Sequence, residues 1–246
     1  MIKEKDIAII ISTFDGAKDL WKPLEDTYKR FWSDCSFPIY LTTNYEYPSL
    51  EVFMPLVIEK EKSWSDNLIK SLIKIEEDYV LLTFDDLFLV DKVDNQEIKK
   101  LMNIAVDRGY NYLQFYRSIS VGKSVGGNLF KKLDSAKYKN STIWSFWKKE
   151  VLISLLKEDE NAWEFEVKGN VRSAEIASFY STKSNIIPFV NGVIKGRWNP
   201  VAKNKIKNLG IEICTSRKSL SFFESIKYQF RDFQFNVYTY IIHLIY

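Results

Sequence analysis

Short, almost uninterrupted apolar runs mark the first third of the chain. They are rich in Ile, Val, Leu and Phe, each ends at polar or turn-forming residues, and they span residues 6–13, 37–43, 52–58 and 79–84. Strands that are covered by protein on both faces have this composition, which is typical of parallel sheets. The runs therefore predict the strands of a buried, mostly parallel sheet.

Segments with helical periodicity lie between these runs. After the turn signal Phe14–Gly16, apolar side chains recur every three or four positions as far as residue 31, and Ser63 opens a second such segment that reaches residue 75. Strands that alternate with helices predict an α/β fold, in which ligands bind beyond the carboxyl ends of the strands.

The remainder of the chain has a weaker pattern. It predicts helices at 96–107, at 148–158 and from 161, strands at 111–117, 143–147 and 178–189, loops around short strands at 118–138, and a short strand bracketed by glycines within 191–198. We therefore expect a mostly parallel sheet flanked by helices in one catalytic domain, residues 1–210, and a helical extension at residues 211–246.

The extension is distinguished by its aromatic and basic residues. On a helix, Phe222, Ile226, Phe230 and Phe233 lie on one side, with basic residues beside them. This combination suits a helix pressed onto an anionic membrane surface. The alternative is a terminal helix that packs on the protein's own core or on a second subunit of a homo-oligomer.

Composition limits the class of protein. The chain of 246 residues is 46% hydrophobic, which predicts a globular fold, and its net charge of +3 is too small to indicate a nucleic-acid-binding protein. No segment resembles a signal peptide, and no apolar run is long enough to cross a bilayer. We expect a cytoplasmic protein, either free or at the inner face of the plasma membrane.

Two residue types exclude further classes. Cys35 and Cys214 lie far apart and are too few for a zinc site, so both are expected to be reduced, structurally ordinary thiols. His243 is the only histidine, so a mid-chain Ser-His-Asp triad, a Cys-His pair and an HExxH zinc site all lack their imidazole.

The most informative stretch is the apolar run 79–90, which contains the adjacent carboxylates Asp85 and Asp86. Charged groups are rarely buried unless they are paired or bind a metal. At the end of a core strand, both could bind a divalent cation that in turn holds the phosphates of a nucleotide. The alternative is a strand that ends in an acidic turn.

A second motif resembles a nucleotide-binding motif only in part. Val121–Ser124 reads Val-Gly-Lys-Ser, like the end of a phosphate-binding P-loop. The first glycine of that motif is replaced by Arg117, and no strand-to-helix transition is predicted there. We therefore do not expect a P-loop.

Five short motifs occur in an order that resembles a known family. They are Ile7–Gly16, Trp64–Leu68, Phe84–Leu89, Trp163–Glu166 and Gly196–Trp198. The chain resembles bacterial GT-A-type glycosyltransferases of lipopolysaccharide and capsule gene clusters, over roughly residues 6–200. The order of the motifs is a stronger signal than any one of them.

The resemblance implies a GT-A-like fold, a nucleotide-sugar donor, with a UDP-sugar as the first expectation, and a Mg²⁺ or Mn²⁺ ion. The sugar would pass to a hydroxyl of a growing, often lipid-linked glycan. Asp85 and Asp86 form a variant of the DxD motif with Phe84 at its first position, so which carboxylate faces the metal and which the ribose stays open. Lys195 and Arg197 would meet the diphosphate, unless they are simply solvated.

The same resemblance assigns donor-binding roles. Thr13 and Asp15, at the end of the first strand, would contact the nucleoside, and Asp66 would do so from the start of the second helix. Asp85 and Asp86 would hold the metal, which stabilises the charge of the leaving diphosphate. Asp85 also counts among the donor-binding residues.

Transfer with inversion needs a carboxylate base for the acceptor hydroxyl. Glu164 or Glu166 is the candidate, and Trp163 and Phe165 are expected to exclude water from it and raise its pKa. The two acids are two positions apart, so on a helix only one can face the chemistry. The alternative is a helix start at which acids are favoured by the helix dipole.

Two other classes of protein remain open. A sugar-phosphate nucleotidyltransferase would use a similar sheet and paired carboxylates, but it usually has a Gly-rich basic loop after the first strand, where this chain has one glycine and an acid at 13–18. A non-catalytic module that binds glycans or a membrane through its aromatic surface would need no divalent metal for nucleotide binding.

Overall fold

A computed structural model describes residues 6–118, 120, 122–132, 139–214 and 216–245. The helices are α1 (Trp21–Phe31), α2 (Trp64–Lys74), α3 (Asn95–Asp107), α4 (Lys149–Leu155), α5 (Ala162–Arg172), α6 (Pro200–Asn208) and α7 (Phe222–Ile245), with a 3-10 helix at Asp15–Leu20. The strands are β1 (Ile7–Ser12), β2 (Ile39–Thr43), β3 (Met54–Val57), β4 (Tyr79–Phe84), β5 (Leu87–Leu89), β6 (Tyr112–Gln114), β7 (Leu129–Lys131), β8 (Ser145–Lys148), β9 (Phe179–Thr182), β10 (Phe189–Asn191), β11 (Val193–Ile194) and β12 (Arg197–Trp198).

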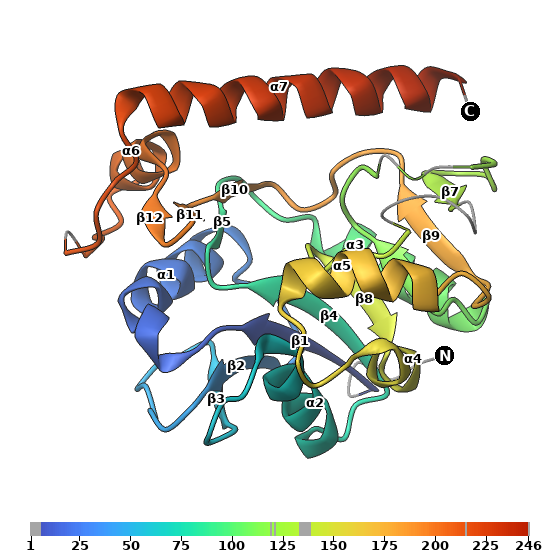
Figure 1. Ribbon diagram of the computed structural model, residues 1–246, viewed down its shortest axis with the longest axis horizontal. Coiled ribbons are helices and arrows are strands. Elements are labelled where there is room, and N and C mark those ends of the chain that lie inside the picture. The colour runs from blue at the N-terminus through green and yellow to red at the C-terminus, as the bar shows by residue number, and fades with distance from the viewer. Residues whose placement is uncertain (1–5, 119, 121, 133–138, 215, 246) are drawn as a thin grey trace.

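In the described part of the chain, eight strands form one sheet in the order β3-β2-β1-β4-β8-β6-β9-β7. The first four strands are parallel, whereas β8 is antiparallel to both β4 and β6. Since β1 and β4 are parallel neighbours in register from Ile7 and Tyr79 onward, their carboxyl ends meet at the same edge of the sheet. Two short ribbons, β5-β10 and β11-β12, lie near this edge (Figure 1).

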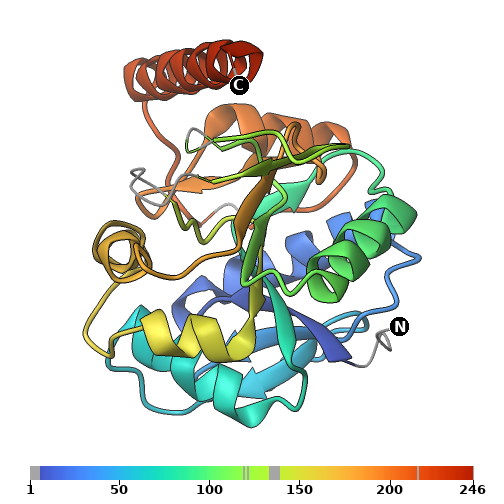
Figure 2. The same cartoon turned by 90° about the vertical axis from the view of Figure 1, so that its right-hand side faces the viewer.

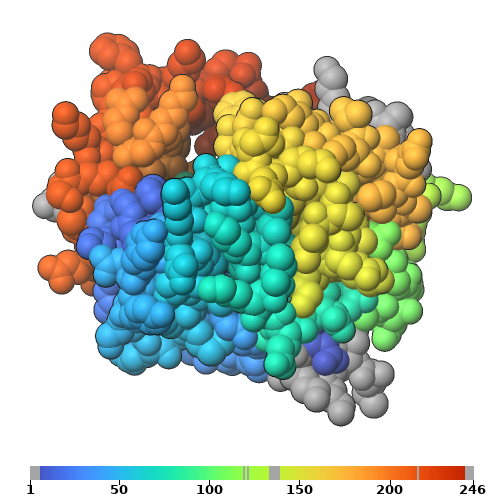
Figure 3. Space-filling view, turned by 60° about the horizontal axis from the view of Figure 1, so that its bottom comes forward, coloured from blue at the N-terminus to red at the C-terminus, as the bar shows by residue number. Residues whose placement is uncertain are grey.

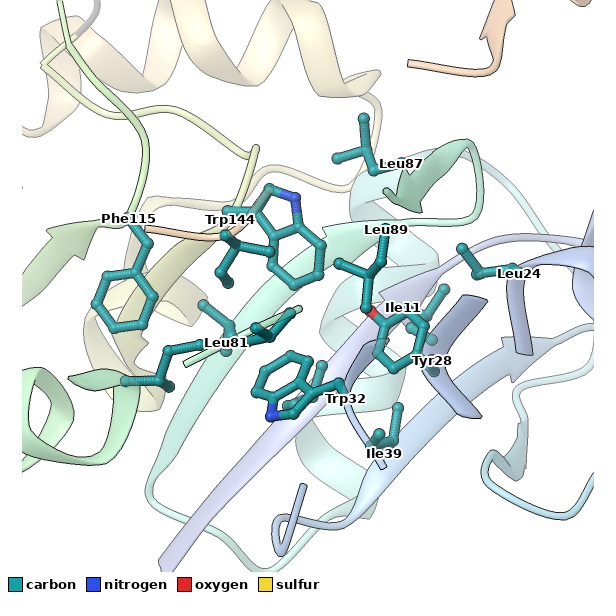
Figure 4. Close-up of a cluster of buried hydrophobic side chains, with 14 of the residues drawn as sticks. Ile11, Leu24, Tyr28, Trp32, Ile39, Leu81, Leu87, Leu89, Phe115 and Trp144 are labelled. Carbon is teal, nitrogen blue, oxygen red and sulfur yellow. The ribbon is translucent and has the colours of Figure 1, made fainter. Parts of the chain in front are cut away.

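Helices cover both faces of the sheet. Successive side chains of β1 point to opposite faces and enter two separate hydrophobic clusters. Ile9 and Ile11 face α1 and α3, whereas Ala8 and Ile10 face α2, α4 and α5. Figure 2 shows these two layers edge-on, on either side of the sheet. Figure 4 shows part of the first cluster, where Trp144 lies near Trp32, with ring centroids 6.4 Å apart.

The observed elements confirm the predicted α/β fold and correct several bounds. The strand predicted at 79–84 is β4, and the helix predicted to open at Ser63 begins there, because the Ser63 side chain accepts the backbone N–H of Asp66. The strand predicted at 178–189 is two strands, β9 and β10. The P-loop-like residues 122–124 lead into β7 rather than a helix, and Val121 lies outside the described residues.

The end of the chain first completes the core and then leaves it. Ile211 and Ile213 are buried in the first core cluster, whereas α7 lies across one end of the molecule (Figure 1). The domain boundary at 210 stays a prediction. No helix among the described residues has both the length and the apolar content that a membrane span requires.

Candidate functional site

The turn between β4 and β5 carries Asp85 and Asp86 at the carboxyl end of a central strand. The Thr13 hydroxyl, at the end of the adjacent β1, donates a hydrogen bond to Asp85 Oδ2 and accepts one of 2.9 Å from Trp21 Nε1. The backbone N–H of Thr13 is held in turn by Thr42 Oγ1 at 2.8 Å. These contacts fix the orientation of the Asp85 carboxylate, so Thr13 positions it.

A neighbouring ribbon fixes the backbone of the same turn. The N–H of Gly192 donates to the carbonyl oxygen of Asp86 at 2.7 Å, directly after the pairing of β10 with β5. A Cβ atom at Gly192 would lie only 2.4 Å from the Phe88 ring and 3.2 Å from Trp198. Glycine is therefore required by close packing at this position.

Burial raises the pKa of both carboxyl groups. For Asp86 the neighbouring charge of Asp85 raises the pKa further, whereas the hydrogen bond from Thr13 and the charge of Arg217 partly oppose the rise at Asp85. Two adjacent carboxylates repel each other when both are ionised. A proton on one of them, or a cation bound to both, relieves this repulsion. The turn therefore favours bound positive charge.

The oxygen atoms of Asp85 and Asp86 fit Mg²⁺ or Mn²⁺, which prefer hard oxygen ligands. Within the described ranges, no three His, Cys, Asp or Glu side chains are grouped to hold a metal. The protein would thus supply two carboxylates, and donor phosphates and water would supply the other ligands, as is common for Mg²⁺.

These raised pKa values give a pH-dependent prediction. A carboxyl whose folded-state pKa exceeds its unfolded-state pKa stabilises the fold fully at low pH and loses that contribution as pH rises through the folded-state pKa. In EDTA, we expect Asp86→Asn to melt above the parent protein near pH 8, with the difference vanishing toward roughly pH 4, the usual aspartate range. Melting curves across pH measure this, with the exposed Asp91→Asn as control; a difference independent of pH would contradict it.

The positively charged side chain of Arg217, in the C-terminal part of the chain, lies beside this turn. The Arg217 guanidinium forms a bidentate pair with Asp19, at 2.5 Å for Nη2 to Oδ1 and 2.9 Å for Nε to Oδ2, and also donates to the carbonyl of Gly196 at 3.1 Å. The hydrogen bonds with Asp19 raise the pKa of Arg217, and the charges of Asp19, Asp85 and Asp86 raise it further. Arg217 was not predicted as part of the site, because 198 positions separate it from Asp19 and no local motif marks either residue.

Arg217 lines a cavity of about 540 Å³ at this edge of the sheet. Its other lining residues are Asp15, Gly16, Lys18, Asp19, Gly196, Arg197, Ser216 and Lys218. The lining holds four basic side chains and two acidic ones; Arg217 is paired with Asp19, and Lys18 and Arg197 are paired with acids outside the lining, Glu46 and Glu224. The cavity can therefore accept an anionic ligand such as a phosphate.

The carboxylate of Asp15 performs a structural task. It accepts the backbone N–H groups of Asn44 at 2.8 Å, Tyr45 at 2.9 Å and Glu46 at 3.3 Å, and so joins the loop after β2 to the end of β1. A nucleoside contact by this carboxylate would compete with three existing hydrogen bonds.

Three other residues predicted to bind the donor are Asp66, Lys195 and Arg197. Each is either paired with another side chain or exposed to solvent. Asp66 is buried in the first turn of α2 and pairs with Lys70 at 2.6 Å. Lys195 is exposed at the tip of the β11-β12 ribbon, with a left-handed φ of 49°. Arg197 lines the 540 Å³ cavity, but it binds Glu224 of α7 through two hydrogen bonds of 3.0 and 2.6 Å. The ribbon therefore anchors α7.

Glu164 caps the helix that carries it. Its backbone N–H donates to the Asn161 side chain at 2.9 Å, and its carboxylate accepts the Asn161 N–H at 3.0 Å, which is a capping box. The other carboxylate oxygen pairs with Lys168 at 3.1 Å. These hydrogen bonds lower the pKa of Glu164, so its carboxylate is a poor proton acceptor. The spacing Asn161–Glu164 was a visible sequence signal for this role.

Glu166 occupies a different environment. Its Oε1 accepts hydrogen bonds from Ser141 Oγ at 2.9 Å, Thr142 N at 2.7 Å and Thr142 Oγ1 at 3.0 Å. The side chain lines a cavity of about 310 Å³ together with Gln114, Tyr116, Arg117, Ser118, Ser141, Ile143 and Phe235. The expected shielding by Trp163 is wrong, because that side chain is 69% exposed; Tyr116, Ile143 and Phe235 line the cavity instead.

The segment that holds Glu166 is bent sharply. Trp144, fully buried, has a φ of 44° in the left-handed region, which is unusual for a bulky residue. The bend ends the strand predicted at 143–147, so β8 begins only at Ser145. It directs Ser141 and Thr142 toward Glu166, and such strain concentrates at functional sites.

Two aromatic contacts join the aspartate turn to the helix of Glu166. Trp64, the first residue of α2, stacks on Phe84 with centroids 6.2 Å apart and packs on Phe165 at 5.7 Å. Phe84 precedes Asp85 and Phe165 precedes Glu166 in the chain. The two acidic sites therefore share one rigid support.

A third cavity, of about 530 Å³, extends from the Glu166 cavity toward the turn with Asp85 and Asp86. The Glu166 cavity and this third cavity are both lined by Tyr116, Ile143 and Phe235, and the third one continues to Leu87 and Asn191. In the space-filling view, a recess separates α5 (yellow) from the C-terminal segments (orange to red) (Figure 3). A cleft beneath α7 thus leads from Glu166 to the residue after Asp86.

No family model matches the sequence, and no curated protein matches it. Among solved structures, the chain is similar to the mannosyltransferase PcManGT from Pyrobaculum calidifontis in complex with GDP-Man and Mn²⁺, with a TM-score of 0.52 and 12% identity. This similarity covers 80% of the present chain and 59% of the mannosyltransferase chain.

Two further structures are more distantly similar. The S. aureus TarS 1–349 structure has a TM-score of 0.46 at 10% identity, over 83% of this chain and 64% of TarS. A UDP-glucose pyrophosphorylase complexed with UDP-glucose has a TM-score of 0.48 at 7% identity, over 77% and 92%. The chain spans less than two thirds of the mannosyltransferase and TarS chains. The mannosyltransferase similarity establishes the fold, a GT-A-like α/β fold, and confirms that expectation.

Proposed function

We propose that this protein is a metal-dependent glycosyltransferase that moves a sugar from a nucleotide-sugar donor to a hydroxyl of a glycan acceptor. The observation that supports this most directly is the turn with Asp85 and Asp86, oriented by Thr13 and flanked by Arg217, at the carboxyl ends of β1 and β4. A GT-A-like fold and a cleft that leads to a second carboxylate, Glu166, agree with it.

On the donor side, Asp85 and Asp86 would hold Mg²⁺ or Mn²⁺, whose charge would stabilise the diphosphate as it leaves. Thr13 keeps the Asp85 carboxylate aimed. Arg217 would bind a phosphate oxygen from the cavity that it lines, through the guanidinium N–H groups other than the three that bind Asp19 and Gly196. This assigns to Arg217 the role first expected of Lys195 and Arg197.

On the acceptor side, Glu166 would accept the proton of the attacking hydroxyl. Its Oε1 is held by Ser141 and Thr142, and no hydrogen bond within the described part of the chain is seen at Oε2, which leaves that oxygen for the substrate. Tyr116 and Phe235 offer aromatic surfaces against which a sugar ring can pack. We propose Glu166 rather than Glu164 as the base.

A thermal-shift panel tests the activity. UDP-, GDP-, CMP- and dTDP-linked sugars are each added with Mn²⁺ and with EDTA. A ligand at a hundred times its Kd stabilises a protein by about 2.7 kcal/mol, or roughly 5–10 °C for a chain of this size. We expect one nucleotide class, first of all UDP-sugars, to give this shift only with Mn²⁺. A shift only with a nucleoside triphosphate and a sugar phosphate would indicate a nucleotidyltransferase instead.

The donor class, the lipid-linked nature of the acceptor and a role in surface-polysaccharide synthesis belong to the same proposal. So does a position at the cytoplasmic face of the membrane. The helix α7, which forms one wall of the cleft, carries that part of the proposal.

A further inference from the structure

The helix α7 turns polar side chains toward the body of the protein, whereas an ordinary surface helix turns apolar side chains inward. The side of α7 that faces the body bears Ser225 and Thr239, which are buried, and Asp232, which lines the 530 Å³ cavity. Within residues 222–241, Phe235 packs on the body, with its ring parallel to that of Tyr116 and the ring centroids 6.2 Å apart. Over residues 222–241, the helix therefore rests on the body through polar groups and the Phe235–Tyr116 stack.

The opposite side of α7 is an apolar stripe. Its residues recur every three or four positions, and all are at least 41% exposed: Phe223, Ile226, Phe230, Phe233, Val237 and Ile241. A helix normally buries such a stripe. Packing on the protein's own core, one of the alternatives from the sequence, does not account for these side chains.

Basic and acidic side chains lie on different sides of α7. Lys227 and Arg231 are exposed beside the apolar stripe. Neither acid within residues 222–241 lies there, because Glu224 is paired with Arg197 and Asp232 lines the cavity. The outward side of the helix is thus apolar with only positive charge at its edge.

We propose that the outward side of α7 adsorbs to an anionic lipid bilayer, with the stripe from Phe223 to Ile241 in the headgroup region and Lys227 and Arg231 on lipid phosphates. Aromatic and aliphatic side chains flanked by cations suit this interface. A second copy of the chain would bring two rows of cations together and is the less favourable occupant.

Adsorption has a consequence for the acceptor, which rests on the proposed function. Because both acceptor-side cavities are lined by α7, the membrane surface would lie about one helix diameter, roughly 10 Å, from the cleft. The substrate class favoured is therefore a short glycan carried by a membrane lipid, presented along the wall formed by Phe235.

Vesicle co-sedimentation of the full chain tests the surface, without nucleotide sugar. We expect binding to phosphatidylcholine vesicles that contain roughly a quarter phosphatidylglycerol, and a loss of about tenfold or more in the double variant Phe230→Ser, Phe233→Ser. Lys227→Gln with Arg231→Gln should remove the preference for the anionic vesicles. The control is Ile73→Ser with Val171→Ser, two exposed apolar side chains on other helices, which should bind like the parent.

Other results would overturn the proposal. They are no vesicle binding, equal binding to neutral and anionic vesicles, or a dimer, seen by light scattering, that the Phe230→Ser, Phe233→Ser variant converts to a monomer. Failure of the proposed function would look different, because vesicle binding would persist while no nucleotide sugar raised the melting temperature. In the reverse case, the nucleotide-sugar shift would persist in a protein that ignores vesicles.

Discussion

Replacing Asp86 by asparagine is expected to remove metal-dependent donor binding without destabilising the protein. Asparagine keeps the size of the side chain and the backbone bond to Gly192, but it removes the charge that a divalent cation needs. Loss of a partner that merely orients a metal ligand costs 10–100-fold in affinity, so loss of the ligand itself is expected to cost more than about 100-fold. The donor titration with Mn²⁺, followed by thermal shift, measures this.

The matched control is Asp91→Asn, an exposed aspartate beyond β5. It should bind donor and Mn²⁺ as the parent does. If Asp86→Asn instead lowered the melting temperature by many degrees while leaving the donor shift intact, the pair would be structural and the metal assignment wrong. The raised pKa of Asp86 argues for the first outcome, because neutralising a destabilised charge relieves the fold.

Replacing Glu166 by glutamine is expected to lower turnover by about 10²–10⁴-fold, the range for loss of a general base. The amide oxygen can still accept the hydrogen bonds of Ser141 and Thr142, so the helix and the cavity should keep their geometry. Donor affinity should be unchanged, because Glu166 faces the acceptor side. Initial rates of sugar transfer, or of donor hydrolysis when water is the acceptor, measure the effect.

Glu164→Gln is the internal control, two residues away on the same helix. It weakens a capping box and an ion pair with Lys168, so a small loss of stability with nearly unchanged turnover is expected. If Glu164→Gln lost activity and Glu166→Gln retained it, the two roles would be exchanged. If both substitutions lowered turnover only slightly, neither glutamate would be the catalytic base.

The buried framework of the fold could be predicted because its signals are local. The run 79–84 is β4, and Ser63 caps α2 through its own side chain. The prediction failed where tertiary contacts override local pattern. Trp144 takes a left-handed conformation that breaks an otherwise strand-like run, because its ring is needed in the core beside Trp32.

The site was only partly accessible from the sequence. Asp85 and Asp86 were identifiable because charge interrupts an apolar strand, whereas the choice between Glu164 and Glu166 depended on which one the helix turns toward Ser141. Arg217 could not be found, because only the completed fold brings the end of the chain back to the first strand. Long-range ion pairs of this kind leave no periodic trace.

Gly192 limits how this protein can diversify. A single methyl group there would strike Phe88 and would push the ribbon away from the carbonyl of Asp86. The loop that follows β10 can therefore change its sequence around this point, but not at it, without moving the aspartate turn. New donor preferences should arise instead through the lining of the Arg217 cavity, where side chains can vary while the carboxylates stay in place.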